Sequence, residues 1–415
     1  MRLKNWWTWV NRKPLYLRWF IYFLLIRPIA EQYYNLKEIS PLLSPLYWLG
    51  VLTLILSIIG ILKGRSIRSG LDKLFYVWGF LIISSVLALY FGSTSLLSYL
   101  NYAIKLSLPV LVYFFLRVFI KNKSDFVGLL TTFLISCIFP ISFLLVGLSG
   151  GEYFTEGRYA GAYADVFNNA FYLSIGIITL LYHYVLNRSY SNTLKVRNSY
   201  VVLGLLIVVM GLWVIKHIAT VIVLLFVLAV FIYIVFRRHK GAAIFLVMLS
   251  LVFIVTTGDK FYSEVLNTRI EKEVEVIEGS RGITQGMHGR MSRWTWLSGE
   301  FRASPIYSQL FGFPYNMKYS NHMVGITPHN DFLRILFFTG YLGLLFYLLI
   351  LVRIYRRIKH RDVPDKFFLN AILLATILYS VTTVPTFYPG YVNILMIAFA
   401  YSALPVSKPY INANS

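Results

Sequence analysis

Long hydrophobic runs separated by short polar segments recur from one end of the 415-residue chain to the other. A run of 18 or more apolar residues is long enough to cross the hydrocarbon core of a bilayer as a helix. The pattern therefore predicts an all-α polytopic membrane protein with about twelve transmembrane helices. These helices are expected at residues 15–30, 42–62, 74–92, 97–119, 126–147, 166–187, 200–215, 217–236, 241–257, 331–353, 367–384 and 388–404.

The polar connections between these runs predict the orientation of the chain. If the N-terminus lies in the cytoplasm, every inside connection is basic: residues 63–73, 120–125, 187–198, 237–240 and 353–366. Two short outside connections, residues 93–96 and 384–390, contain no lysine or arginine. An excess of basic residues on the cytoplasmic side is typical of membrane proteins. The basic, tryptophan-bearing first 20 residues resemble a retained cytoplasmic leader more than a signal peptide.

This orientation divides the chain into three parts. Residues 1–257 form nine helices after a cytoplasmic N-terminus, residues 258–330 form one large periplasmic or extracytoplasmic loop, and residues 331–415 form three helices before a cytoplasmic C-terminus. A second outside segment covers residues 149–170. Within the large loop, Trp294, Leu297 and Phe301 recur at three- and four-residue intervals, which predicts a helix.

Composition supports this prediction and excludes other classes. Hydrophobic residues make up 58% of the chain and charged residues only 13%, which is too apolar for a soluble protein. The net charge of +22 would suit a nucleic-acid-binding protein, but most basic residues lie in the short connections where they set orientation. The only cysteine, Cys137, excludes a disulfide framework. The expected localisation is a membrane that the chain crosses several times.

The unusual polar residues share one predicted side, the outside. They include His329, which follows Pro328 at the mouth of a membrane helix, with Asn330 or Asp331 as the expected N-cap. A histidine at the membrane boundary is suited to proton transfer near neutral pH. The alternative is an interfacial turn whose polar side chains only satisfy helix-end amides.

Further cations are predicted on the same side. Arg290 and Arg293 are three residues apart, so they share one face of a helix and are suited to clamping phosphate oxygens. Lys216 and His217 interrupt a long apolar run at an outer hairpin, and Arg158 precedes the next helix. Solvated loop cations and a snorkelling lysine are the structural alternatives. No metal-ligand spacing, Walker motif or nucleophile elbow occurs in the sequence.

Four blocks of sequence, in order, resemble the O-antigen ligase / O-antigen polymerase superfamily of bacterial envelope glycosyltransferases. They are "GRYAGAYADVFNNAF", "IKHIATVIVLL", "GRMSRWTWLSGEFRASPIYSQLFGFP" and "PHNDFLRILFFTGYLGLL". The chain departs from the family pattern at Lys216, where arginine is usual, and at His217, where a small residue is usual. The "LFGFP" segment also keeps only one glycine of a Gly-x-Gly element.

The resemblance implies a GT-C-like membrane fold, a location in the bacterial inner membrane and a function. A glycan would be transferred from undecaprenyl diphosphate to an acceptor hydroxyl on the outer face without a metal or other cofactor. It implies His329 as base and Arg290 as the main diphosphate ligand. Diphosphate- or substrate-binding residues would be Arg158, Lys216, Arg293, His217, Asn330, Asp331 and Trp294.

The acceptor stays open at this point. A polymerase would extend a lipid-linked repeat, with a polysaccharide chain-length regulator as its partner. A ligase would use lipid A core, and an O-oligosaccharyltransferase would use protein hydroxyls. The polymerase is favoured because such enzymes are numerous and divergent. A lipid-linked oligosaccharide flippase is the alternative from another class, although such transporters are expected to show two similar halves. Expected partners are the lipid-linked oligosaccharide and the bilayer, and nucleic acid is not among them.

Overall fold

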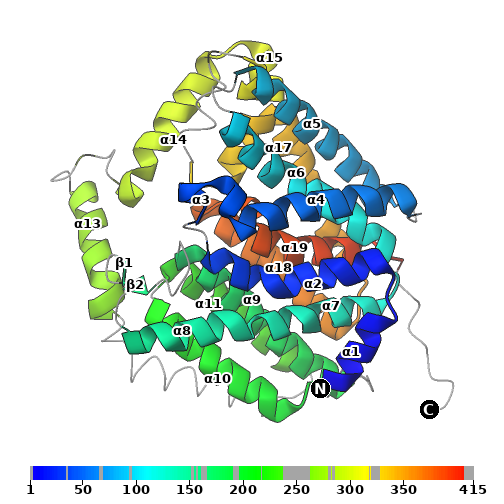
Figure 1. Cartoon of the computed structure of the whole chain (residues 1–415). Helices are drawn as coiled ribbons and strands as arrows, with labels where there is room; N and C mark the ends of the chain where they lie inside the picture. The colour runs from blue at the N-terminus through cyan, green and yellow to red at the C-terminus, as the bar shows by residue number, and fades with distance from the viewer. Residues whose placement is uncertain are drawn as a thin grey trace.

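The computed structural model is almost entirely helical (Figure 1). It describes residues 3–33, 36–64, 69–92, 96–150, 154–155, 158–159, 166–189, 196–215, 217–236, 262–278, 282, 286–316, 318 and 328–405. The described strands are β1 (Phe154–Thr155) and β2 (Arg158–Tyr159), which pair antiparallel. The prediction of a helical membrane protein is confirmed.

The helices follow the order of the hydrophobic runs. The first part of the chain forms α1 (Leu3–Asn11), α2 (Leu15–Gln32), α3 (Leu36–Ile39), η1 (Pro41–Leu43), α4 (Pro45–Lys63), α5 (Gly70–Gly92), α6 (Leu96–Phe119), α7 (Lys123–Ser136), α8 (Ile138–Gly150), α9 (Val166–Ser189), α10 (Asn198–Ile215) and α11 (Ile218–Phe236). The rest forms η2 (Tyr262–Asn267), α13 (Thr268–Ile277), α14 (Gly286–Ala303), α15 (Ile306–Phe311), η4 (Phe313–Tyr315), α17 (Asp331–Ile358), α18 (Val363–Thr382), η5 (Pro385–Phe387) and α19 (Pro389–Ser402).

Seven helical segments in the described part of the chain are long and apolar enough to cross a membrane. They are Pro45–Lys63, Gly70–Phe91, Tyr99–Phe119, Lys123–Leu145, Val166–Asn187, Asp331–Ile358 and Val363–Thr382. The chain is therefore a multi-pass membrane protein, whereas the count of twelve spans stays a prediction. The expected helix at 241–257 lies outside the described residues. The expected helix at 126–147 is divided at Cys137 into α7 and α8.

Polar contacts join the helix ends into two groups, which we call the inner and outer ends after the predicted sidedness. At the inner end, the Lys123 ammonium at the start of α7 binds the Asp362 and Asp365 carboxylates at the start of α18. At the outer end, the Asn330 amide before α17 donates to the Val381 carbonyl near the end of α18, at 3.2 Å. Each contact joins ends that the sequence predicts on the same side.

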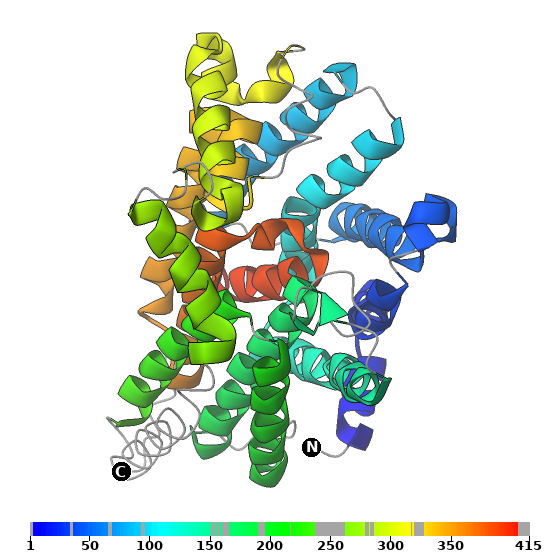
Figure 2. The same ribbon diagram turned by 90° about the vertical axis from the view of Figure 1, so that its left-hand side faces the viewer.

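The helices of the large loop lie against the outer end of the bundle. Figure 2, viewed from that side, shows α13 and α14 in front of the membrane helices. Phe301 of α14 is buried, and its ring centroid lies 5.5 Å from that of Phe337 in α17. Phe313 stacks on the same Phe337 ring. This aromatic cluster fixes α14 relative to α17.

Two glycines allow the backbone of the loop to meet α17. Gly340 interrupts α17 with a φ of 68° and a ψ of −172°, a conformation that is essentially restricted to glycine. A Cβ at Gly340 would lie 2.2 Å from the carbonyl carbon of Leu310. Similarly, a Cβ at Gly312, whose φ is 108°, would lie 2.2 Å from the carbonyl oxygen of Phe338. The end of α15 is thus seated in a break of α17.

Candidate functional site

The site is built around the start of α17. Asn330 is the N-cap, since its Oδ1 accepts a hydrogen bond from the Leu333 amide at 3.0 Å. A proline at 328 followed by a capping asparagine ends the loop and begins the helix abruptly. His329 between them has a φ of 49°, in the left-handed region. Its side chain is half-buried and does not take part in the cap.

Asp331 has a structural role, which departs from its predicted contact with substrate. Its side chain is fully buried, and its Oδ1 accepts hydrogen bonds from Nε and Nη2 of Arg334 at 2.9 and 2.7 Å. Oδ2 accepts from the Thr386 amide at 3.0 Å, and Oδ1 also accepts from the Thr386 hydroxyl at 2.9 Å. The carboxylate therefore ties α17 to η5. Within the described residues, no hydrogen bond joins it to His329.

Helix α14 brings three of the predicted residues to this point. The Arg290 guanidinium donates from Nη1 to the Thr382 carbonyl, at 2.8 Å, and so contacts the last turn of α18. The Trp294 indole donates to the Pro328 carbonyl, next to His329. Trp294 thus holds the histidine loop, and its contact with substrate stays a prediction. Arg293 is exposed on the same helix.

Burial and the two arginines of α14 all act on the pKa of His329 in the same direction. Burial lowers the pKa of the imidazole below its ordinary value of 6.5, and the nearby charges of Arg290 and Arg293 lower it further. Each of these causes penalises the imidazolium form. At neutral pH the imidazole is therefore uncharged, and a neutral imidazole is able to accept a proton. The structure thus brings His329, Arg290, Arg293 and Trp294 together.

The last turn of α18 also reaches the start of α11. The Tyr379 hydroxyl donates to the Thr220 hydroxyl at 2.9 Å. Nδ1 of His217 lies 2.6 Å from the same Thr220 oxygen and accepts from the Thr220 amide at 3.3 Å. His217 is buried, and its ring packs edge-on against Phe167 of α9, with centroids 4.6 Å apart. His217 is therefore a buried residue that immediately precedes α11 and packs against neighbouring helices.

Two predicted cations are placed less completely. Lys216 lies outside the described residues. For Arg158 the structure describes the backbone, which belongs to β2, and β2 contacts α10.

Sequence reasoning missed a cationic cluster beside the site. The ring of Phe387, in η5, has the Lys105 ammonium of α6 4.7 Å from its centroid and the Arg334 guanidinium 5.1 Å from it. Arg334 and Thr386 also line a small hollow together with Leu106. The three-residue spacing of Asp331 and Arg334 was a signal for their ion pair. The contact with Phe387 depends on tertiary packing and has no such signal.

No group of three or more histidine, cysteine, aspartate or glutamate side chains is arranged to hold a metal ion within the part of the chain that the structure describes. The chain was also compared with known proteins. No protein-family model matches it, and no curated protein does.

Proposed function

We propose that the protein is an inner-membrane glycosyltransferase with a GT-C-like fold of about twelve spans. It transfers a glycan from undecaprenyl diphosphate to an acceptor hydroxyl on the outer face, as an O-antigen or exopolysaccharide polymerase. The observation that carries the proposal is the pairing of an uncharged, half-buried histidine with two arginines at one end of the bundle. A base and a diphosphate ligand are the two groups that this reaction requires.

In the proposed reaction, the acceptor oxygen attacks the anomeric carbon of the donor sugar. His329 takes the proton of the acceptor hydroxyl as the new carbon–oxygen bond forms. The bond between the anomeric carbon and the diphosphate breaks, and the diphosphate leaves with the electron pair. Arg290 and Arg293 stabilise the negative charge that develops on the leaving group.

The neighbouring residues have supporting roles in this proposal. Trp294 and Asn330 hold the His329 loop through their hydrogen bonds to Pro328 and Val381. Trp296 is exposed on α14 and offers an aromatic face for a sugar ring. Because fixed arginines neutralise the leaving group, we expect activity to survive EDTA. Loss in EDTA that Mg²⁺ or Mn²⁺ restores would contradict metal independence.

The proposed base is tested by replacing His329 with a residue that can adopt the same left-handed backbone conformation. His329→Asn keeps a side chain that is favoured at positive φ but cannot act as a base near neutral pH. We expect it to abolish glycan elongation by membranes while the protein reaches the membrane at wild-type amounts. Normal long chains in this variant would remove His329 from the reaction.

The arginine is tested by a change that keeps its charge. Arg290→Lys retains a cation but loses the planar fork that binds two phosphate oxygens at once. We expect a loss of about tenfold or more in elongation rate, since a charge-assisted hydrogen bond contributes roughly 1.5–3 kcal/mol. Arg302→Lys, an exposed position on the same helix, is the matched control. Equal activity of the two variants would reduce Arg290 to a generic charge.

Deletion of the gene in its native host distinguishes the acceptor. A polymerase defect leaves single repeat units attached to lipid A core or to another final acceptor. A ligase defect instead leaves polymer on undecaprenyl diphosphate. If both the polymer and the single-repeat glycan are lost and lipid-linked repeats accumulate on the cytoplasmic face, the protein is a flippase and the proposed transfer is wrong.

A further inference from the structure

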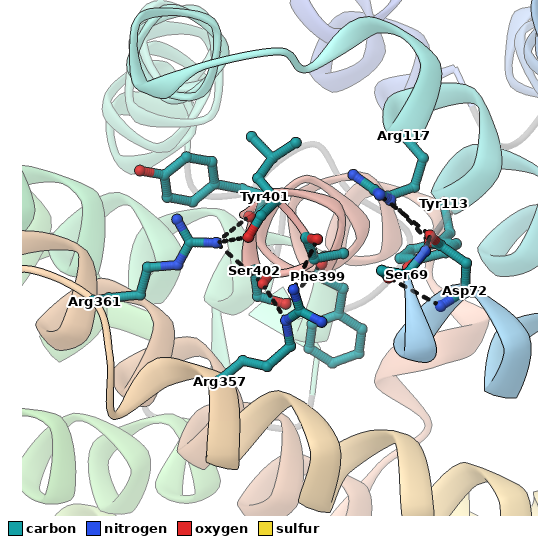
Figure 3. A network of polar contacts seen from close by, with 11 residues as sticks. Ser69, Asp72, Tyr113, Arg117, Arg357, Arg361, Phe399, Tyr401 and Ser402 are labelled. Carbon is teal, nitrogen blue, oxygen red and sulfur yellow. Dashed lines mark hydrogen bonds and ion pairs between the residues drawn. The ribbon is translucent and has the colours of Figure 1, made fainter. Parts of the chain in front are cut away.

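A second cationic cluster lies at the opposite, inner end of the bundle. Figure 3 shows Arg357 and Arg361 reaching toward the last turn of α19, with Arg117 and Asp72 close by. Arg357 donates from Nε to the Ser402 carbonyl at 3.0 Å. Arg361 donates from Nη2 to the Leu404 carbonyl at 2.7 Å. These arginines therefore bind carbonyl groups at the C-terminal end of α19.

The carboxylate in this cluster already has its partners. Asp72 accepts hydrogen bonds from Nε of Arg117 at 2.8 Å and from the Tyr113 hydroxyl at 2.6 Å. Its Oδ2 also accepts from the Ser69 amide at 2.6 Å. Asp72 and the Arg117 guanidinium are both buried. Asp72 and Arg117 thus form a buried ion pair with each other. Among the described residues, no carboxylate pairs with Arg357 or Arg361.

The remaining arginines repel one another. The charges of Arg361, Arg353 and Arg117 all act unfavourably on the half-buried Arg357. The Arg353 side chain reaches the start of α5, since a Cβ at Gly70 would lie 3.3 Å from its Nη2. The loop before α5, residues 65–68, contains no aspartate or glutamate. Orientation alone accounts for basic loops, but not for arginines at the end of α17 that contact both the start of α5 and the end of α19.

The two helices that meet at this end, α5 and α17, also carry exposed apolar side chains. Val77 and Phe80 are exposed on α5, and Leu349 and Val352 are exposed on α17. These two helices pack against each other. A charged cluster at the end of an apolar surface formed by neighbouring helices matches the two parts of a phospholipid, its anionic head and its acyl chains.

We propose that Arg353, Arg357 and Arg361 bind the phosphate of an anionic phospholipid in the inner leaflet, with the acyl chains lying along α5 and α17. An anion there offsets the repulsion among the arginines and links the ends of α5, α17 and α19. The inference depends on the predicted sidedness and is independent of the proposed glycosyltransferase activity.

Arg353 provides the cleanest variant for a test. Its side chain is exposed and forms no hydrogen bond within the described residues, so Arg353→Gln is expected to fold. The full-length protein is placed in phosphatidylcholine nanodiscs, phosphatidylglycerol is added in steps, and retained lipids are counted by native mass spectrometry. We expect preferential retention of phosphatidylglycerol and about tenfold weaker retention in Arg353→Gln, the effect of losing one charge-assisted hydrogen bond to the lipid phosphate.

Two controls decide whether the site is specific. Arg353→Lys keeps the charge and should retain most of the binding. Arg356→Gln removes an exposed charge from the same turn of α17 and should leave it unchanged. Equal losses in Arg353→Gln and Arg356→Gln would mean diffuse surface attraction and would overturn the proposal. So would equal retention of the two lipids, or displacement of phosphatidylglycerol by millimolar inorganic phosphate at constant ionic strength, which would indicate a site for free phosphate.

Discussion

At the scale of the residue, His329 combines an unusual backbone conformation with an uncharged side chain. Its left-handed φ turns the chain sharply between a buried proline and the α17 cap. Burial and the charges of Arg290 and Arg293 act in the same direction on its pKa. Burial and these two charges therefore both favour the neutral imidazole, which is the form that a base requires.

This arrangement predicts the pH dependence of the proposed activity. Because the pKa of His329 is lowered, the midpoint of the acid limb of the rate profile should lie below pH 6.5. Arg293→Gln removes one of the causes and should move that limb upward, toward the ordinary histidine value. The measurement is glycan elongation as a function of pH in isolated membranes. Arg302→Gln, also exposed on α14, is the control, and an equal shift in both variants would contradict the proposed contact.

The folding equilibrium should respond with the same sign. Between the lowered pKa of His329 and 6.5, the unfolded chain binds more protons than the folded protein does. The stability associated with this group is therefore fully present above pH 6.5 and is lost as the pH falls through its folded pKa.

Single residues also mark where sequence reasoning ends. The order of residues 328 to 334 was sufficient to predict a helix that begins after a proline and an N-cap residue. These features depend only on residues that are neighbours in the sequence. It left open whether Asp331 capped the helix or oriented His329. The answer depends on Thr386, 55 positions away. Only the packing of η5 against α17 brings that hydroxyl and amide to the carboxylate.

At the scale of the element, α17 differs most from its prediction. The sequence predicts one continuous helix from residue 331, since its apolar residues show no interruption. The break at Gly340 exists because the backbone at Leu310 occupies the space where a side chain would lie. A lone glycine in a membrane helix is common, so sequence alone does not show that this one is required.

The break predicts opposite effects for two glycine substitutions. Gly340→Ala places a Cβ in contact with the Leu310 backbone and in a φ/ψ region that alanine avoids, so we expect a destabilisation of roughly 3 kcal/mol or more. Gly299→Ala, within α14, meets no atom within 4 Å and should stabilise by roughly 0.5–1 kcal/mol. Thermal unfolding of the two purified proteins checks this, and a similar melting temperature for both would contradict the insertion of α15.

At the scale of the whole molecule, the alternation of basic and uncharged connections carries most of the predictive information. Hydrophobic length locates helices well because the bilayer imposes a minimum span on them. The bilayer imposes no minimum length on helices in the loop between residues 258 and 330. The sequence of this loop predicted the helix α14, but it did not predict where α14 lies on the bundle. That position depends on Phe301 and Phe337, which are joined only in the fold.

The predicted sidedness is open to a direct test because the chain has one cysteine, Cys137, which is buried. In a Cys137→Ser background, Trp296→Cys introduces a thiol on α14, at the outer end, where the native side chain is 42% exposed. Lys359→Cys introduces one just beyond α17, at the inner end, where the native side chain is also exposed. A membrane-impermeant maleimide should label the first variant in right-side-out vesicles and the second in inverted vesicles. Reversed labelling would contradict the assignment of His329 and Arg290 to the outer face. Labelling of both variants from one side would contradict a membrane span at α17, which separates the His329 end from the Lys359 end.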